Sequence, residues 1–149
     1  MMRQGSMVAA IVMAVGLSAS GAFAGQDAPR KLVAPVRGEA KVEITKPDTK
    51  PGPKEVVTTM LVKNISNAPI AGLKIEENWY KGNNAVGGDS YRHPRPLPPG
   101  EVIQVTLRVP RDKIVGARNQ YQFSHANGTV KVTTVPKLDA PKPSPTAAK

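Results

Sequence analysis

Apolar and polar residues alternate in short segments along this chain, and prolines and glycines separate one segment from the next. The clearest segment is 101–109, in which Ile103, Val105, Leu107 and Val109 occupy alternate positions. Successive side chains of a β-strand point to opposite faces, so this period predicts a half-buried strand. Apolar residues at helical spacing are nearly missing. The sequence therefore predicts an all-β protein.

Six or seven such segments recur, with turn signals about every 8–12 residues, a spacing typical of a two-sheet sandwich. The expected strands are 41–45, 55–64, 70–81, 101–109, 118–126 and 129–135, with a weak edge strand at 85–91. The proline-rich segment 46–54 is expected to be a connection only. We predict a single antiparallel β-sandwich of about seven strands with Greek-key routing, and a small barrel is the alternative.

One charged residue interrupts an apolar row in the segment 70–81. Leu73, Ile75 and Trp79 share one face, and Glu77 falls on the same face. A bulge, or a strand that runs past the edge of the core, would accommodate this carboxylate. We expect Trp79, Tyr121 and Phe123 to lie in the core, and Tyr80 and Tyr91 to be exposed. Further along, Asn127-Gly128 predicts a hairpin, because both residues tolerate positive φ.

The two ends of the chain differ from the middle. Residues 1–24 read as a secretory signal peptide: Arg3 precedes an apolar run at 7–17, and Ala22-Phe23-Ala24 forms an A-x-A cleavage pattern. The run is too short to span a membrane, so we expect export to the periplasm or the medium and a soluble protein after cleavage near Ala24. We expect a flexible arm at 25–38, one folded domain at 39–135 and a disordered Pro/Lys-rich tail at 136–149.

Charge and cysteine content limit the chemistry of the chain. It holds 21 Lys and Arg against 11 Asp and Glu, a formal net charge of +10, and it has no cysteine. Stability therefore cannot come from disulfides, and thiol chemistry is excluded. The positive charge either keeps the protein soluble or attracts an anionic partner.

Turn and core landmarks carry a resemblance to a known fold. Asn64-Ile65-Ser66 ends one strand, Trp79-Tyr80 precedes Gly82 and Val86, and Leu97-Pro-Pro-Gly-Glu101 opens the best strand. In these landmarks the chain resembles the immunoglobulin-like modules of bacterial envelope proteins, of the FxLYD and CARDB type. The resemblance covers about 56–135 and departs from the pattern in a long insert at 87–96. It implies an immunoglobulin-like sandwich, and such modules serve as spacers, adhesion units or protein-binding domains.

Catalytic and metal sites find little support in the sequence. The two histidines, His93 and His125, are far apart in sequence and are expected to face solvent, whereas a zinc site needs three or four ligands. Glu76 and Glu77 are adjacent on a strand and point to opposite faces, so they cannot act as an acid–base pair. Asp89, Ser90 and His93 lack a nucleophile elbow. We therefore predict no enzyme activity, no metal and no cofactor.

The strongest candidate for a binding surface is the segment 91–96. Its prolines stiffen it, and Arg92 and Arg95 offer two guanidinium groups suited to carboxylate or phosphate; Tyr91 and His93 complete the candidate set. A solvated basic loop is the alternative interpretation. We expect an exported, non-catalytic module that binds another macromolecule through a sheet edge or through 91–96, or that serves as an envelope accessory protein. An electrostatic binder of anionic envelope polymer or extracellular nucleic acid is the second possibility, which salt dependence distinguishes.

Overall fold

The computed structural model describes residues 33–141. These residues form eight strands and one short helix. Their bounds are β1 (Ala40–Thr45), β2 (Asp48–Pro51), β3 (Glu55–Asn64), β4 (Lys74–Lys81), β5 (Asn84–Arg92), β6 (Val102–Pro110), α1 (Arg111–Ile114), β7 (Arg118–His125) and β8 (Gly128–Val135). Within this range no helix is long and apolar enough to span a membrane. The predicted signal peptide, most of the arm and the end of the tail lie outside the described residues.

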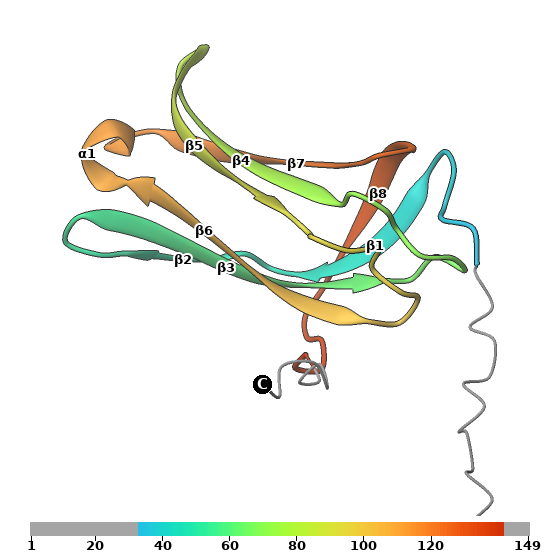
Figure 1. Ribbon diagram of the computed structural model, residues 1–149. Coiled ribbons are helices and arrows are strands. Elements are labelled where there is room, and N and C mark those ends of the chain that lie inside the picture. Colours follow the sequence, from blue (N-terminus) through green and yellow to red (C-terminus); the bar gives the residue numbers. More distant parts are fainter. Residues whose placement is uncertain (1–32, 142–149) are drawn as a thin grey trace, which may run out of the picture. The chain divides into compact units, whose positions relative to one another are not determined.

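The strands form one curled sheet in the order β2-β3-β1-β8-β7-β4-β5, with β6 on the other side of β3. The sheet curls so that β4, β5 and β7 lie opposite β2, β3 and β6 (Figure 1). The all-β prediction is therefore confirmed. Pairing is antiparallel except between β1 and β8, which run parallel with Val42 beside Val132. The prediction of a purely antiparallel sheet is wrong at this pair, because β8 leaves its hairpin partner β7 and continues along β1.

The segment 46–54 is more than a connection, contrary to the prediction. Asp48–Pro51 form β2, which pairs with β3 so that Thr49 lies beside Thr58. All four residues of β2 are exposed. Proline is tolerated here because β2 is an edge strand and need not donate a hydrogen bond on its free side.

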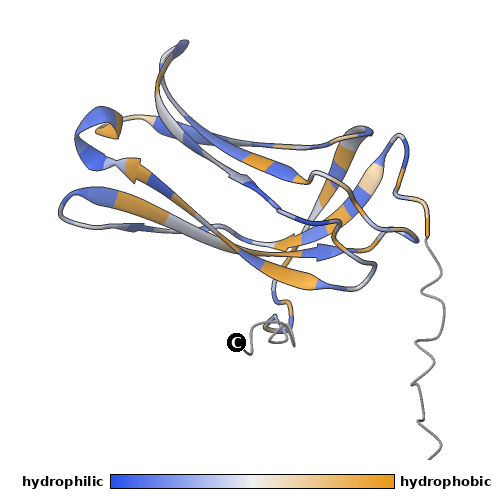
Figure 2. Ribbon diagram, viewed as in Figure 1, coloured by the Kyte–Doolittle hydropathy of each residue, from blue (hydrophilic) through white to orange (hydrophobic). Residues whose placement is uncertain are grey.

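The core lies inside the curl. Figure 2 shows hydrophobic and hydrophilic residues alternating along the strands, as the period-2 pattern requires. The main cluster includes Val42, Met60, Ile75 and Leu107, and Tyr121 and Phe123 pack against it half-buried. Trp79 is buried as predicted, but in a second cluster with Val56, Val109 and Ile114 beside α1.

Asn64 at the end of β3 anchors the loops near the core. Its side chain is fully buried, and its amide donates to the carbonyls of Ala68 (3.0 Å) and Leu97 (2.8 Å). Its carbonyl Oδ1 accepts from the backbone N–H of Ser66 at 2.8 Å. The Asn64-Ile-Ser66 landmark therefore has a physical role: it closes the turn after β3 and fixes the loop that leads into β6.

A β7–β8 hairpin forms at the predicted place, but its loop residues are Ala126 and Asn127, one position before the predicted pair, and Gly128 begins β8. Asn127 keeps a negative φ, since positive φ among the described residues is confined to glycines. Gly128, at φ +154°, lies so close to the backbone of Gly38 that a Cβ would overlap the Gly38 carbonyl oxygen. Gly38 in turn donates to the Asn127 carbonyl at 3.0 Å, so the end of the expected arm is held against this hairpin.

Candidate functional site

Tyr91, Arg92, His93 and Arg95 lie together where β5 ends and the chain turns toward β6. The Tyr91 hydroxyl and His93 Nδ1 share a hydrogen bond of 2.9 Å. His93 is only 8% exposed and Tyr91 is half-buried, so the expectation that both face solvent is wrong. The cause is a backbone hydrogen bond: the His93 N–H donates to the Leu73 carbonyl at 2.8 Å, which holds His93 against the beginning of β4.

The second feature of this segment is an internal ion pair. Both terminal nitrogens of Arg95 donate to the Glu101 carboxylate, one of them at 3.1 Å. The bidentate geometry that suits a ligand carboxylate is thus occupied by the chain's own glutamate. Arg92 is exposed beside Lys74 and keeps its charge toward solvent. A binding role for these four residues stays a prediction.

Burial dominates the electrostatics of this cluster. It lowers the pKa of His93, an effect that the nearby Arg95 charge increases and Glu101 opposes. It also raises the pKa of the Tyr91 hydroxyl, against the opposing influence of Arg95. Both groups therefore favour their neutral forms.

His125, the other histidine, is also buried, at 7% exposure, and the expectation that it faces solvent is wrong. Its Nε2 lies 2.7 Å from the Gly38 carbonyl oxygen, and its Nδ1 accepts from the backbone N–H of Asn127 at 3.3 Å. Because a carbonyl only accepts, Nε2 carries the proton in this arrangement. Among the described residues, no group of three His, Asp or Glu side chains is placed to hold a metal ion.

The edges of β5 and β6 face each other and are linked by one side chain. Asp89 accepts the backbone N–H of Ser90 on β5 at 2.8 Å and that of Arg108 on β6 at 2.9 Å. The β5 edge is further disrupted by a bulge opposite Trp79 and Tyr80. Capping groups and bulges are the usual means by which proteins protect sheet edges from pairing with other chains. Both edges are thus guarded.

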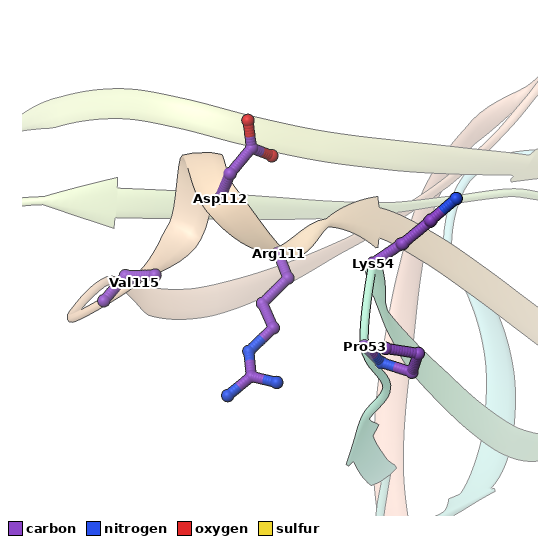
Figure 3. A pocket seen from close by; sticks show the side chains of 5 residues that line it. All are labelled: Pro53, Lys54, Arg111, Asp112 and Val115. Carbon is purple, nitrogen blue, oxygen red and sulfur yellow. The ribbon is translucent and has the colours of Figure 1, made fainter.

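Shallow depressions occur on the surface of the described residues. One of about 480 Å³ lies beside α1 and is lined by Pro53, Lys54, Arg111, Asp112 and Val115. Figure 3 shows the side chains of Lys54, Arg111 and Asp112 pointing in different directions. Ligand sites instead hold polar groups that converge on one point. Another, of about 510 Å³, lies over the two glycines of β5, Gly87 and Gly88.

The edge of β7 is different, because most of it has no neighbouring strand among residues 33–141. On one side β7 pairs with β4 in an uninterrupted register over 74–80. On the other side β8 pairs only with Ser124 and His125 and then turns away, as Figure 1 shows at the β7–β8 hairpin. Residues 118–123 are therefore unpaired on that side within the part of the chain described.

The hairpin fixes which backbone groups of β7 face this free edge. His125 and Gly128 close a two-residue loop, so the N–H and C=O of His125 point toward β8. Backbone direction alternates along a strand, so the same groups of Asn119, Tyr121 and Phe123 point to the free side. Neither proline, lysine nor a bulge occurs in β7. This edge is regular and unguarded.

A buried carboxylate lies behind this edge. Glu77 is 1% exposed, and the register of β4 with β7 is regular around it. The prediction that a bulge, or a strand running past the edge of the core, accommodates Glu77 is therefore wrong. Its Oε1 accepts from the Thr58 hydroxyl (2.9 Å), the Tyr121 hydroxyl (3.0 Å) and the Asn119 amide (3.1 Å). These donors explain why a charged residue is tolerated in an apolar row.

The second oxygen of Glu77 has no such support. Glu77 Oε2 is buried, and no group in the described part of the chain donates a hydrogen bond to it. Burial, followed by the charge of Glu77, raises the pKa of Tyr121 to about 12, so this phenol stays a donor. The sequence held a signal for this cluster, since Thr58 and Glu77 are polar residues within apolar rows, but only the fold brings them to Asn119 and Tyr121.

Comparison with known proteins adds no family to these observations: no protein-family model matches the chain, and neither does any curated protein.

Proposed function

We propose that this chain is an exported, non-catalytic immunoglobulin-like module that binds an extended segment of a partner protein by strand addition to β7. The observation that carries the proposal is the regular, unpaired edge of β7 over 118–123. Main-chain groups give such a complex its affinity, and side chains at alternate positions give it specificity.

The strand order supports an immunoglobulin-like sandwich. In that fold, strands A, B and E belong to one sheet and strands C, F and G to the other. Here β1, β3 and β6 are neighbours, and so are β4, β7 and β8. The buried Trp79 on β4 corresponds to the tryptophan that such domains carry on strand C. The FxLYD and CARDB resemblance, which rests on turn and core landmarks, points the same way.

The contrast between edges supports β7 as the binding edge. Natural proteins protect exposed edges with short strands, proline, lysine, bulges or capping side chains. Lys50 and Pro51 occupy the short strand β2, and Asp89 caps both β5 and β6. An edge that keeps six residues unprotected would risk aggregation unless a partner covers it. The export part of the proposal rests on the apolar run 7–17 and the A-x-A pattern at 22–24.

The absence of cysteine allows a direct test, because one introduced cysteine is the only labelling site. Gln122 on β7 and Ser90 on β5 both lie beside Glu76, on opposite sides of β4, and both are exposed. Gln122→Cys and Ser90→Cys variants carrying a photo-crosslinker therefore form a matched pair. In a bacterial envelope extract, we expect Gln122→Cys to crosslink to one defined protein and Ser90→Cys to give none.

Two results would contradict strand addition to β7. Equal crosslinking from the two positions would remove the distinction between the edges. A complex that dissociates almost entirely between about 50 and 200 mM salt would favour the electrostatic alternative, since binding to anionic polymers falls steeply with salt. Strand addition rests on neutral backbone hydrogen bonds and should persist over this range.

A further inference from the structure

Glu77 is a buried carboxylate that pairs with no cation of the described residues. Thr58, Asn119 and Tyr121 all donate to Oε1, whereas Oε2 is buried and unpartnered. Within residues 33–141 the ion pairs involve other carboxylates, and Glu77 belongs to none of them. Buried charges are normally paired, because burial of an unpaired ion is costly. Among the described residues, Glu77 Oε2 therefore lacks both a cation and a hydrogen-bond donor.

The cations of the same strands do not supply this partner. Lys74 pairs with Glu76 at 2.6 Å on the opposite face of β4. Arg118 and Lys81 are exposed at the end where β4 and β7 pair. The side chains of Lys74 and Arg118 point away from Glu77, because alternate residues of a strand occupy opposite faces. Lys81 shares the face of Glu77 but lies four residues further along β4, and among the ion pairs of residues 33–141 none joins it to Glu77.

On the side of β7 the residues of the cluster are partly exposed. Glu77 lies beside Tyr121 in the register of β4 and β7. Asn119 and Tyr121 are only half-buried, and Thr49 on β2, which contacts the Thr58 hydroxyl at 3.2 Å, is exposed. A strand added to β7 would place one inward-facing residue beside Tyr121, about 10 Å from the Glu77 backbone, which is two strand spacings. The side chains of a lysine or arginine and of Glu77 together span that distance.

We infer that the segment bound at β7 carries a lysine or arginine at the position beside Tyr121, and that this cation pairs with Glu77 Oε2. The inference rests on the proposed strand addition and names its specificity-determining contact. Glu77 then selects the register of the partner, because a shift of one residue would turn the cation to the outer face. The hydroxyls of Thr58 and Tyr121 and the Asn119 amide hold the carboxylate in place for this pair.

The test uses random extended peptides displayed on phage and selected against the wild-type protein. Bound clones are then sorted by whether they slow amide hydrogen exchange at Asn119, Tyr121 and Phe123. We expect clones that protect these amides to share a lysine or arginine at one position. Replacement of that residue by glutamine in the peptide should weaken binding roughly thirtyfold or more, since truncating one member of a buried ion pair is costly.

A second selection against Glu77→Gln should yield edge-binding peptides without this preference. Because the lysine-to-glutamine change is made in the peptide, the wild-type measurement holds even if Glu77→Gln fails to fold. Peptides that protect the β7 amides with no preference for a cation would overturn the inference and leave strand addition intact. Failure of every peptide to protect these amides would overturn both.

Discussion

Removal of one donor from Glu77 tests the energetics of the buried cluster. Thr58 is fully buried, and its hydroxyl donates to Glu77 Oε1 at 2.9 Å. Valine has nearly the same shape as threonine, so Thr58→Val removes the hydroxyl and leaves the packing almost unchanged. Hydrogen bonds to charged groups contribute about 1.5–3 kcal/mol. Since Oε1 keeps the Asn119 and Tyr121 donors, we expect a loss of about 2 kcal/mol, near the lower end of that range.

The loss should be plain in a melting experiment. For a domain of this size, about 2 kcal/mol lowers Tm by about 8–16 °C. Urea unfolding followed by circular dichroism gives the free energy directly if the transition is two-state. Thr59→Val is the matched control: Thr59 is the next residue of β3, faces the other side of the sheet and is half-exposed. It should change stability by less than about 0.5 kcal/mol. Equal stability of the two variants would refute the view that Glu77 depends on its donors.

Three further predictions concern other parts of the fold. Trp79→Ala should cost about 3–5 kcal/mol by emptying the cluster beside α1, so the domain should unfold or nearly unfold; an unchanged Tm would refute core placement. His93 has a lowered pKa in the folded state, so below about pH 6.5 the unfolded chain binds a proton that the folded chain does not. The free energy of unfolding should therefore decrease as the pH is lowered below this value. This slope should be shallower in His93→Gln, and an identical pH profile would count against the buried position. Gly128→Ala should lower Tm because its Cβ overlaps the Gly38 carbonyl, whereas Gly82→Ala, with open space around its Cβ, tests the cost of positive φ alone; equal losses would disprove the overlap.

Much of the fold is predictable because its signals are local. The alternation of 101–109 predicts which residues of β6 are buried, and Ile103, Val105, Leu107 and Val109 are all buried. The hairpin between β7 and β8 is also predicted from local residues, although its loop is Ala126-Asn127 and Gly128 is required by close contact with the Gly38 backbone. Alternation and turn residues report on immediate neighbours, and these elements depend on little else.

The features that escaped prediction depend on residues distant in sequence. The sequence of Asp48–Pro51 predicts a connection because proline is rare in strands, and in a sheet it is found mainly on edge strands such as β2. Glu77 is accommodated by Thr58 on β3 and by Asn119 and Tyr121 on β7, donors that no local window contains. His93 is buried because its backbone pairs with Leu73, twenty residues earlier.

The sequence predicts the strand that carries the candidate edge, but not that one side of this strand is free. The pattern of 118–126 predicts a strand within a sheet. One side of this strand is free because β8 leaves β7 after Thr129 and pairs with β1. That choice of partner is a property of the whole sheet. The basic segment 91–96, by contrast, is evident from the sequence, but the Arg95–Glu101 ion pair neutralises part of its positive charge.

Amide hydrogen exchange of β7, measured by NMR with and without the crosslinked partner, tests the central claim most directly. In the free protein, the amides of Asn119, Tyr121 and Phe123 should exchange quickly, whereas those of Gln120 and Gln122, which point toward β4, should be protected. Partner binding should slow the first three and leave the other two unchanged. Equal protection of all five amides in the free protein, or no slowing on binding, would contradict strand addition to this edge.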